Sequence, residues 1–198
     1  MDYEKIALVY NSYSGMHKPS WKLEPLMAFL KKNSEVNLND VAKGIDIETE
    51  VTIACQSGAE LIIACGGDGT VHSSANGILK GNSDAVLAVL PFGTVNDFAS
   101  VIGMTDKIDH FISVLETGAV KKIDVGLCNG LYFINVVAVG AFTDVGYAVP
   151  RPLKKLFGRL AYLAYGVKDS LKYLKESHRV RMEINGDVVE EELTLFTV

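Results

Sequence analysis

The residue types best suited to chemistry lie in two short glycine-rich segments. The first is Gly-Gly-Asp-Gly-Thr at 66–70, and the second is Pro-Phe-Gly-Thr-Val-Asn-Asp at 91–97. Glycine lets the backbone approach phosphate oxygens closely, and peptide N–H groups at the start of a helix attract anions. A bare carboxylate repels phosphate, so Asp68 makes sense as a Mg²⁺ ligand or as the acceptor of a proton from an attacking hydroxyl. Asn96 and Asp97 offer polar groups at the start of the following helix.

Each glycine-rich segment follows an apolar run and precedes a segment that can form a helix. The runs Glu60–Cys65 and Ala85–Leu90 predict buried strands. Strand, glycine turn and helix, in that order, is how a parallel α/β fold holds phosphate. Either turn alone could equally be an ordinary strand-to-helix connection with a helix cap. Two turns, each with an Asp, favour one polyphosphate site built from neighbouring strand ends.

The elements that must position these turns repeat a strand-and-helix pattern. A buried first strand is expected at 5–10 and a polar turn at 11–15. Helices are expected around 23–30, 49–57, 71–79 and 108–115. Residues 34–47 are polar and poorly patterned, and we assign no strand there. The pattern predicts an N-terminal α/β nucleotide-binding domain with a parallel sheet over residues 1–121.

The pattern changes near Lys122, where a second domain of antiparallel β character is expected over residues 122–198. Asn129-Gly130 and Asn185-Gly186 are each flanked by apolar strand runs, which indicates two type I′ hairpins. A helical insertion is expected between them, at about 150–177. The chain stops at Val198 within an apolar run, so we expect the second domain to be truncated in this chain.

Composition and charge exclude several classes of protein. The chain has 198 residues, 48% of them hydrophobic, and a net charge of −5. No apolar stretch reaches the ~18–20 residues that span a bilayer, and the first residues lack a secretion signal, so a cytoplasmic location is expected. The three cysteines have no metal-ligand spacing and are expected to be buried thiols.

A basic segment from Arg151 to Arg181 stands out on this acidic chain. It holds nine basic and two acidic residues, a net charge of +7. A local patch of this kind indicates a local anionic partner and argues against bulk nucleic-acid binding. Its leucines form a broad apolar face, which fits docking on an anionic membrane surface, although a solvated helix face would look the same.

Taken together, the motifs resemble the catalytic domain of the diacylglycerol kinase and lipid kinase family. That family includes the sphingosine kinases and is distantly related to the NAD kinases. The resemblance rests on GGDGT at 66–70 and LPFGTVNDFA at 90–99, and it continues through KIDVG at 122–126 and YFIN at 132–135. It implies an ATP-dependent kinase that phosphorylates a lipid hydroxyl, with diacylglycerol as the leading acceptor and phosphatidate as the product.

The resemblance also implies the site residues and two cofactors, ATP and Mg²⁺. The residues implied to bind nucleotide are Asn11, Ser12, Tyr13, Ser14, Gly15, Gly66, Gly67, Asp68, Gly69, Thr70, Val71, His72 and Thr94. Asn96, on the second turn, is added to the candidate nucleotide contacts because of its polar side chain. Asp68 and Asp97 are the catalytic candidates, and Asp144 is a candidate substrate contact. The Mg²⁺ ligands and the proposed catalytic Glu of the family are expected beyond residue 198, so no metal ligand is named.

Two departures from the family pattern keep alternatives open. Ser12 stands where the family usually has Pro, and Ser73 stands where it usually has Glu. A missing carboxylate near the phosphates would weaken turnover or shift the acceptor. The alternatives are a kinase of a soluble substrate, similar to NAD kinases, and a nucleotide-binding regulator without turnover.

The expected partner is a lipid at the inner face of an anionic membrane, reached by peripheral association. No nucleic-acid partner is expected, and a homodimer is left open.

Overall fold

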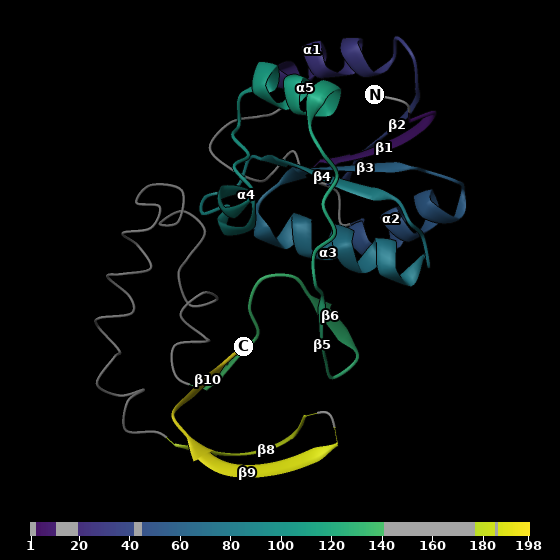
Figure 1. Cartoon of the computed structure of the whole chain (residues 1–198). Helices are drawn as coiled ribbons and strands as arrows, with labels where there is room; N and C mark the ends of the chain where they lie inside the picture. The colour runs from purple at the N-terminus through teal and green to yellow at the C-terminus, as the bar shows by residue number, and fades with distance from the viewer. Residues whose placement is uncertain (1–2, 11–19, 42–44, 141–176, 185) are drawn as a thin grey trace. The chain divides into compact units, whose positions relative to one another are not determined.

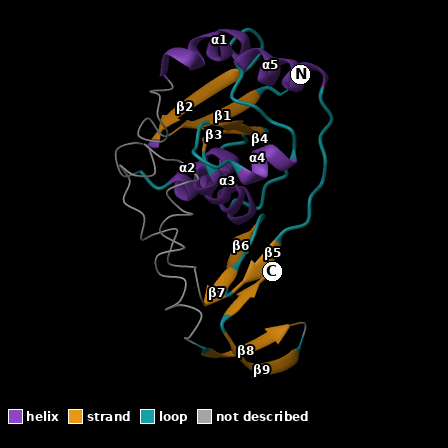
Figure 2. Ribbon diagram, turned by 90° about the vertical axis from the view of Figure 1, so that its left-hand side faces the viewer, coloured by secondary structure: helices purple, strands orange, loops and turns teal. Residues whose placement is uncertain are grey.

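The computed structural model describes residues 3–10, 20–41, 45–140, 177–184 and 186–198. The chain divides into two compact units, Met1–Asn135 and Val136–Val198. The first unit holds a parallel sheet with helices, and antiparallel strands follow toward the C-terminus, so the predicted fold class is confirmed (Figure 2). The division falls after Asn135, whereas the sequence placed it before Lys122, and the first hairpin therefore belongs to the first unit.

The first unit is built on a four-stranded parallel sheet with the order β2-β1-β3-β4 (Figure 1). Its strands are β1 Lys5–Tyr10, β2 Glu35–Asp40, β3 Leu61–Gly66 and β4 Val86–Pro91. Every residue of β3 is buried, as are four consecutive residues of β1. A central parallel strand is covered on both faces, which is why these strands show as continuous apolar runs in the sequence. The predicted positions of β1, β3 and β4 are confirmed to within one residue.

Strand β2 is the strand that the sequence pattern does not reveal. Its sequence, Glu-Val-Asn-Leu-Asn-Asp, is mostly polar, and none of its residues is buried. It lies at the edge of the sheet, where it pairs with β1 alone. Backbone pairing, extended by a hydrogen bond from Glu35 N to Glu4 O of 2.7 Å, therefore holds this strand more than burial does.

Helices cover both faces of the sheet and enclose two core layers. Figure 1 shows α1 and α5 over one face, with α2 and α3 against the other. The helices are α1 Ser20–Leu30, α2 Ile47–Gln56, α3 Asp68–Lys80, α4 Asp97–Val101 and α5 Ile108–Thr117. Side chains alternate along β1, so Ile6 and Leu8 pack in the layer of α1 and α5, while Ala7 and Val9 pack in the layer of α2, α3 and α4. The helices predicted after the strands are confirmed.

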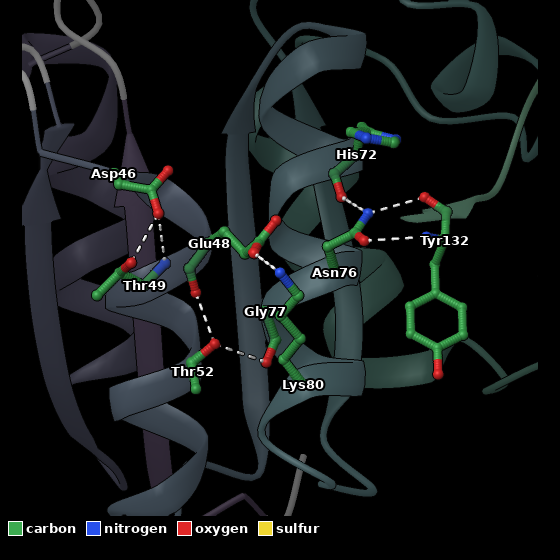
Figure 3. Close-up of polar contacts among 9 residues, drawn as sticks. All are labelled: Asp46, Glu48, Thr49, Thr52, His72, Asn76, Gly77, Lys80 and Tyr132. Atoms are coloured by element: carbon green, nitrogen blue, oxygen red, sulfur yellow. Dashed lines mark hydrogen bonds and ion pairs between the residues drawn. The ribbon is translucent and has the colours of Figure 1, made fainter. Parts of the chain in front are cut away.

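Helices α2 and α3 approach each other closely at Gly77. A Cβ atom on Gly77 would lie 2.7 Å from the carbonyl oxygen of Glu48 and from Cβ of Val51, so only glycine fits there. The Thr52 hydroxyl lies in the same contact, with Oγ1 2.8 Å from Glu48 O and 3.2 Å from Gly77 O (Figure 3). An ion pair from Lys80 to Glu48 joins the same two helices. This contact fixes α3, and with it the first glycine turn, against the rest of the unit.

A hairpin of two short strands, β5 Gly126–Cys128 and β6 Leu131–Phe133, follows the sheet. Asn129 and Gly130 connect them with positive φ angles of 49° and 79°, which confirms the predicted type I′ turn. The side chain of Asn76 on α3 ties this hairpin to the helix. Its Nδ2 donates to Tyr132 O at 2.9 Å, and its Oδ1 accepts from Tyr132 N at 3.2 Å (Figure 3).

The hydroxyl of Ser74, on α3, gives a stability prediction. Ser74 is fully buried, and its Oγ has no hydrogen-bond partner within the described part of the chain. A buried polar group without a partner costs about 1–3 kcal/mol, and alanine favours the helix more than serine does. We therefore expect Ser74→Ala to raise the free energy of unfolding by about 1 kcal/mol in urea denaturation. Ser73→Ala, at the partly exposed neighbouring position, is the control. A clear loss of stability in Ser74→Ala would show that the hydroxyl is satisfied after all.

The second unit contains two antiparallel strand pairs. Strand β7 Ala138–Gly140 pairs with β10 Leu195–Thr197, and β8 His178–Ile184 pairs with β9 Asp187–Leu193. Ile184 faces Asp187 in the register, which confirms the second predicted hairpin. The helical insertion predicted at 150–177 lies almost wholly outside the described residues. Among the helices that are described, none is long and apolar enough to cross a membrane.

Candidate functional site

The two glycine turns meet at the carboxyl edge of the sheet. They follow the neighbouring strands β3 and β4, whose register pairs Gly66 with Pro91. The ladder continues into the turns, because Phe92 N donates to Gly66 O at 2.9 Å. A Cβ atom on Gly93 would lie 2.3 Å from the Cα atom of Gly67. The backbones of the two turns are therefore in direct contact, and no side chain fits between them.

The first glycine turn is already the start of helix α3. The helix begins at Asp68, and the N–H groups of Thr70 and Val71 donate to Gly67 O at 2.9 and 3.1 Å. The sequence predicted the helix only from Val71 onward. Gly69, in the first turn, is exposed, and a Cβ atom on it would have no neighbour within 4 Å. An anion can therefore reach the backbone of this turn, where the helix start is electropositive.

Gly67 is required by the backbone of the other turn, at Gly93, whereas Gly66 is required by the side chain of Thr70. A Cβ atom on Gly66 would lie 2.2 Å from the hydroxyl oxygen of Thr70, whose side chain folds back over the end of β3. Thr70 is consequently buried, with 6% of its surface exposed. The first turn thus packs its threonine inward while its exposed glycine faces outward.

Asn96 shapes the second glycine turn from within. Its backbone lies in the left-handed region, with φ 57° and ψ 48°, a conformation that asparagine tolerates better than most residues. Its Oδ1 accepts from Gly93 N at 2.9 Å, and its Nδ2 donates to Gly93 O at 3.0 Å. The amide of Asn96 therefore holds Gly93 in place, beside Gly67.

The carboxylate of Asp68 links the two turns. Its Oδ1 accepts a hydrogen bond from Phe98 N, in the first turn of α4, at 3.2 Å. Helix α4 has no side-chain cap from its own N-cap residue, Asn96, so Asp68 supplies the acceptor from the other turn. Asp68 also occupies the first position of α3, where negative charge is favourable. Only one of its two oxygens takes part in this hydrogen bond, and a carboxylate can accept on both.

The structure places the other predicted site residues as follows. Val71 is buried in the core layer of α2 and α3, and its neighbour His72 has an exposed side chain. Thr94 and Asp97 are exposed on the second turn. The turn Asn11, Ser12, Tyr13, Ser14 and Gly15 lies outside the described residues, as does Asp144. Of the predicted carboxylates, Asp68 is the one whose contact with the other glycine turn the structure describes.

The groups available for binding at this edge are carboxylate oxygens, which can bind a cation, and backbone N–H groups, which can bind phosphate. Carboxylates such as Asp68 and Asp97 suit a hard cation like Mg²⁺, which also takes ligands from phosphates and water. In the described part of the chain no group of three or more His, Cys, Asp or Glu side chains could hold a metal ion by itself.

The order of the strands locates the site within the sheet. The chain leaves β1 toward β2 on one side and reaches β3 and β4 on the other, so the direction of winding reverses between β1 and β3. In open parallel sheets, ligands bind outside the carboxyl ends of the strands at such a switch point. Tyr10 and Asp40, the last residues of β1 and β2, lie at the same edge. Sequence reasoning missed both, because β2 itself was not recognised.

Comparison with known proteins identifies relatives over nearly the whole chain. The sequence model of the diacylglycerol kinase catalytic domain matches residues 5–128. A diacylglycerol kinase of Staphylococcus aureus strain MRSA252 is 32% identical over 98% of this chain, and that of Staphylococcus epidermidis strain RP62A is 34% identical over 98%. The chain spans 61% of the length of each of these relatives.

The solved structures that superpose on this chain are also described as diacylglycerol kinases. A diacylglycerol kinase structure from Bacillus anthracis strain Sterne superposes with a TM-score of 0.68 at 25% identity, covering 100% of this chain and 64% of that one. A second structure from that strain, described as a candidate diacylglycerol kinase, superposes with a TM-score of 0.74 at 27% identity and is covered to 65%.

Proposed function

The chain belongs to the diacylglycerol kinase catalytic domain family, and on that premise we propose that it acts as an ATP-dependent lipid kinase. The reaction transfers the γ-phosphoryl group of ATP to the free hydroxyl of a diacylglycerol, giving phosphatidate and ADP. The observation that carries this proposal is the contact between Gly67 and Gly93, which brings two glycine turns together at the carboxyl edge of the sheet.

We assign the phosphate-binding role to the backbone of the two turns. The first turn of α3 is electropositive and is accessible at Gly69. The exposed Thr94, next to Gly93, adds a hydroxyl donor at the second turn. Phosphoryl transfer depends almost entirely on positioning and on charge stabilisation, so a rigid backbone cradle suits the reaction. We keep His72 and the turn at 11–15 as proposed contacts.

We assign the chemical step to the carboxylates. Asp68 lies at the contact of the two turns, where it either accepts the proton of the attacking lipid hydroxyl or helps to hold a cation; Asp97, on the second turn, is the other candidate. Mg²⁺ would neutralise charge on the phosphate oxygens, and Asp68 and Asp97 are the residues of the two turns that would hold it. The hydrogen bond from Phe98 fixes the orientation of the Asp68 carboxylate before substrate arrives.

An assay with labelled ATP tests the proposed function directly. The full-length protein is offered diacylglycerol and sphingosine in mixed micelles, and NAD⁺ as a soluble acceptor. We expect label in phosphatidate and little in the other products. Transfer to NAD⁺ alone would favour the soluble-substrate kinase. Binding of ATP without transfer to any acceptor would favour a regulator without turnover.

We further propose that the protein reaches its lipid by peripheral association with an anionic membrane surface. The basic segment Arg151–Arg181 carries a net charge of +7, and each basic residue near such a surface contributes about 1 kcal/mol of attraction. We expect the protein to float with vesicles rich in anionic lipid at low salt. A triple variant, Lys154→Glu, Lys155→Glu and Arg159→Glu, should bind far less. Equal flotation of the two proteins would show that this segment is not the docking surface. Uncharged vesicles serve as the control.

A further inference from the structure

Asn76, in the second half of α3, is a buried polar side chain to which the proposed chemistry gives no role. Only 1% of its surface is exposed. Its Nδ2 donates to Tyr132 O at 2.9 Å and to His72 O at 3.1 Å, and its Oδ1 accepts from Tyr132 N at 3.2 Å (Figure 3). The two hydrogens of the amide and its oxygen are therefore all engaged, so the side chain has one fixed orientation.

The amide of Asn76 takes the place of a strand beside β6. Residues that face each other in an antiparallel pair alternate between those that exchange hydrogen bonds and those whose N–H and C=O groups point away from the partner strand. Tyr132 faces Leu127 of β5, and its N–H and C=O groups both bind Asn76. A hairpin of two strands is marginally stable by itself in water, so its position depends on anchors of this kind.

The same hairpin leads the chain out of the first unit. Strand β6 ends at Phe133, and the second unit begins at Val136. Ile134, one of the two residues between them, packs against the core layer of α2, α3 and α4. The hydrogen bonds of Asn76 and the packing of Ile134 therefore fix the last residues of the first unit against the helices.

Helix α3 joins this anchor to the glycine turns. Asp68 is the first residue of the helix, and Asn76 lies eight residues later, about 12 Å along the axis. Gly77, next to Asn76, packs against α2, so the helix is held from two sides at this level. The hairpin is consequently fixed to the same element that carries the carboxylate of Asp68.

We propose that Asn76 is a positioning residue for phosphoryl transfer to the lipid, because it fixes the point at which the chain leaves the first unit relative to Asp68. This inference rests on the proposed function, since it assumes that the second unit, which contains the basic segment 151–181, presents the lipid. The reacting atoms must lie about 3–3.5 Å apart, and a misplacement of about 1 Å costs up to about a hundredfold in rate. Loss of the anchor should slow transfer to the lipid and spare ATP binding at the glycine turns.

The test compares two variants of the full-length protein with a matched control. Asn76→Ala removes all three hydrogen bonds, and Asn76→Asp keeps an acceptor for Tyr132 N but turns a second oxygen toward Tyr132 O. In both variants kcat for phosphatidate formation should fall by about tenfold to a hundredfold, while the Kd of ATP, measured by calorimetry, stays within about twofold of wild type. The fraction of ATP hydrolysed by water should rise. Thr52→Val removes a hydrogen bond to Gly77 from the side of α2 and should leave kcat and Kd unchanged.

The possible outcomes separate this inference from the proposed function. Unchanged kcat in the Asn76 variants would overturn the inference while the lipid kinase activity stands. A parallel loss of ATP affinity, or loss of the fold in both variants, would show that Asn76 supports the scaffold only and would also overturn it; if Asn76→Ala alone fails to fold, Asn76→Asp decides. An equal fall of kcat in Thr52→Val would show that any loosening of α3 has this effect, which again overturns it. Absence of transfer to diacylglycerol by wild type would contradict the proposed function, and the inference with it.

Discussion

Gly93→Ala should remove nucleotide binding almost completely. The added Cβ atom would lie 2.3 Å from Gly67 Cα and 2.5 Å from Asn96 Oδ1. The first of these neighbours is backbone, so the two turns must move apart to admit the methyl group. We expect ATP affinity to fall by about a hundredfold or more, equivalent to at least about 2.7 kcal/mol. Titration calorimetry measures this loss, and thermal denaturation reports how far the turns are strained.

Gly69→Ala separates phosphate approach from damage to the scaffold. The same methyl group at Gly69 meets no protein atom within 4 Å, so the fold should tolerate it. Alanine is also the better helix former by about 1 kcal/mol, so stability should hold or rise slightly. We nevertheless expect weaker ATP binding, because the methyl group would occupy the space from which phosphate reaches the backbone of α3. Normal ATP affinity in both glycine variants would contradict the assignment of these turns to phosphate binding.

Asp68→Asn should nearly abolish turnover while leaving the protein folded. The amide keeps an oxygen that accepts from Phe98 N, but it can neither take a proton nor hold a cation as a carboxylate does. Loss of a general base or of a charge partner in phosphoryl transfer typically costs 10²–10⁴-fold, and we expect a fall of about that size in kcat. Initial rates of the full-length enzyme at saturating ATP and diacylglycerol give this value. An Asp68→Asn enzyme with normal kcat would remove Asp68 from the chemical step.

Asp68→Ala is the companion that isolates the structural part of this role. Alanine offers no acceptor to Phe98 N, so α4 loses the capping hydrogen bond that Asp68 provides. We expect the free energy of unfolding to fall by about 0.5–2 kcal/mol, the usual cost of losing a helix cap. Asp68→Asn should stay within about 1 kcal/mol of wild type, because only the favourable charge at the helix starts is lost. Urea denaturation of the two variants compares these costs.

Much of the first unit could be predicted because its central strands are buried on both faces. Strands β1 and β3 form continuous apolar runs, and the glycines beyond them mark where each strand ends. Strand β2 could not be predicted, since an edge strand without a buried residue leaves no hydrophobic pattern. Recognition of Asp40 depends on that strand, because only the register shows that it lies beside Tyr10.

The site residues could be predicted as a group, but their mutual contacts could not. The motifs at 66–70 and 91–97 indicated phosphate binding, yet the contact of Gly67 with Gly93 follows from the register of β3 and β4. The hydrogen bond from Phe98 to Asp68 joins residues 30 positions apart and likewise depends on tertiary structure. Asn96 was predicted to contact nucleotide, and its amide is hydrogen-bonded to Gly93 in the turn.

The central claim is that nucleotide phosphates are held where the two glycine turns meet. A crystal structure of the protein with a non-hydrolysable ATP analogue and Mg²⁺ tests this claim most directly. The account predicts phosphate oxygens within hydrogen-bonding distance of backbone N–H groups in the first turn of α3 and beside Gly93, with the Asp68 carboxylate close to the γ-phosphate. A nucleotide whose phosphates lie away from both turns would contradict it.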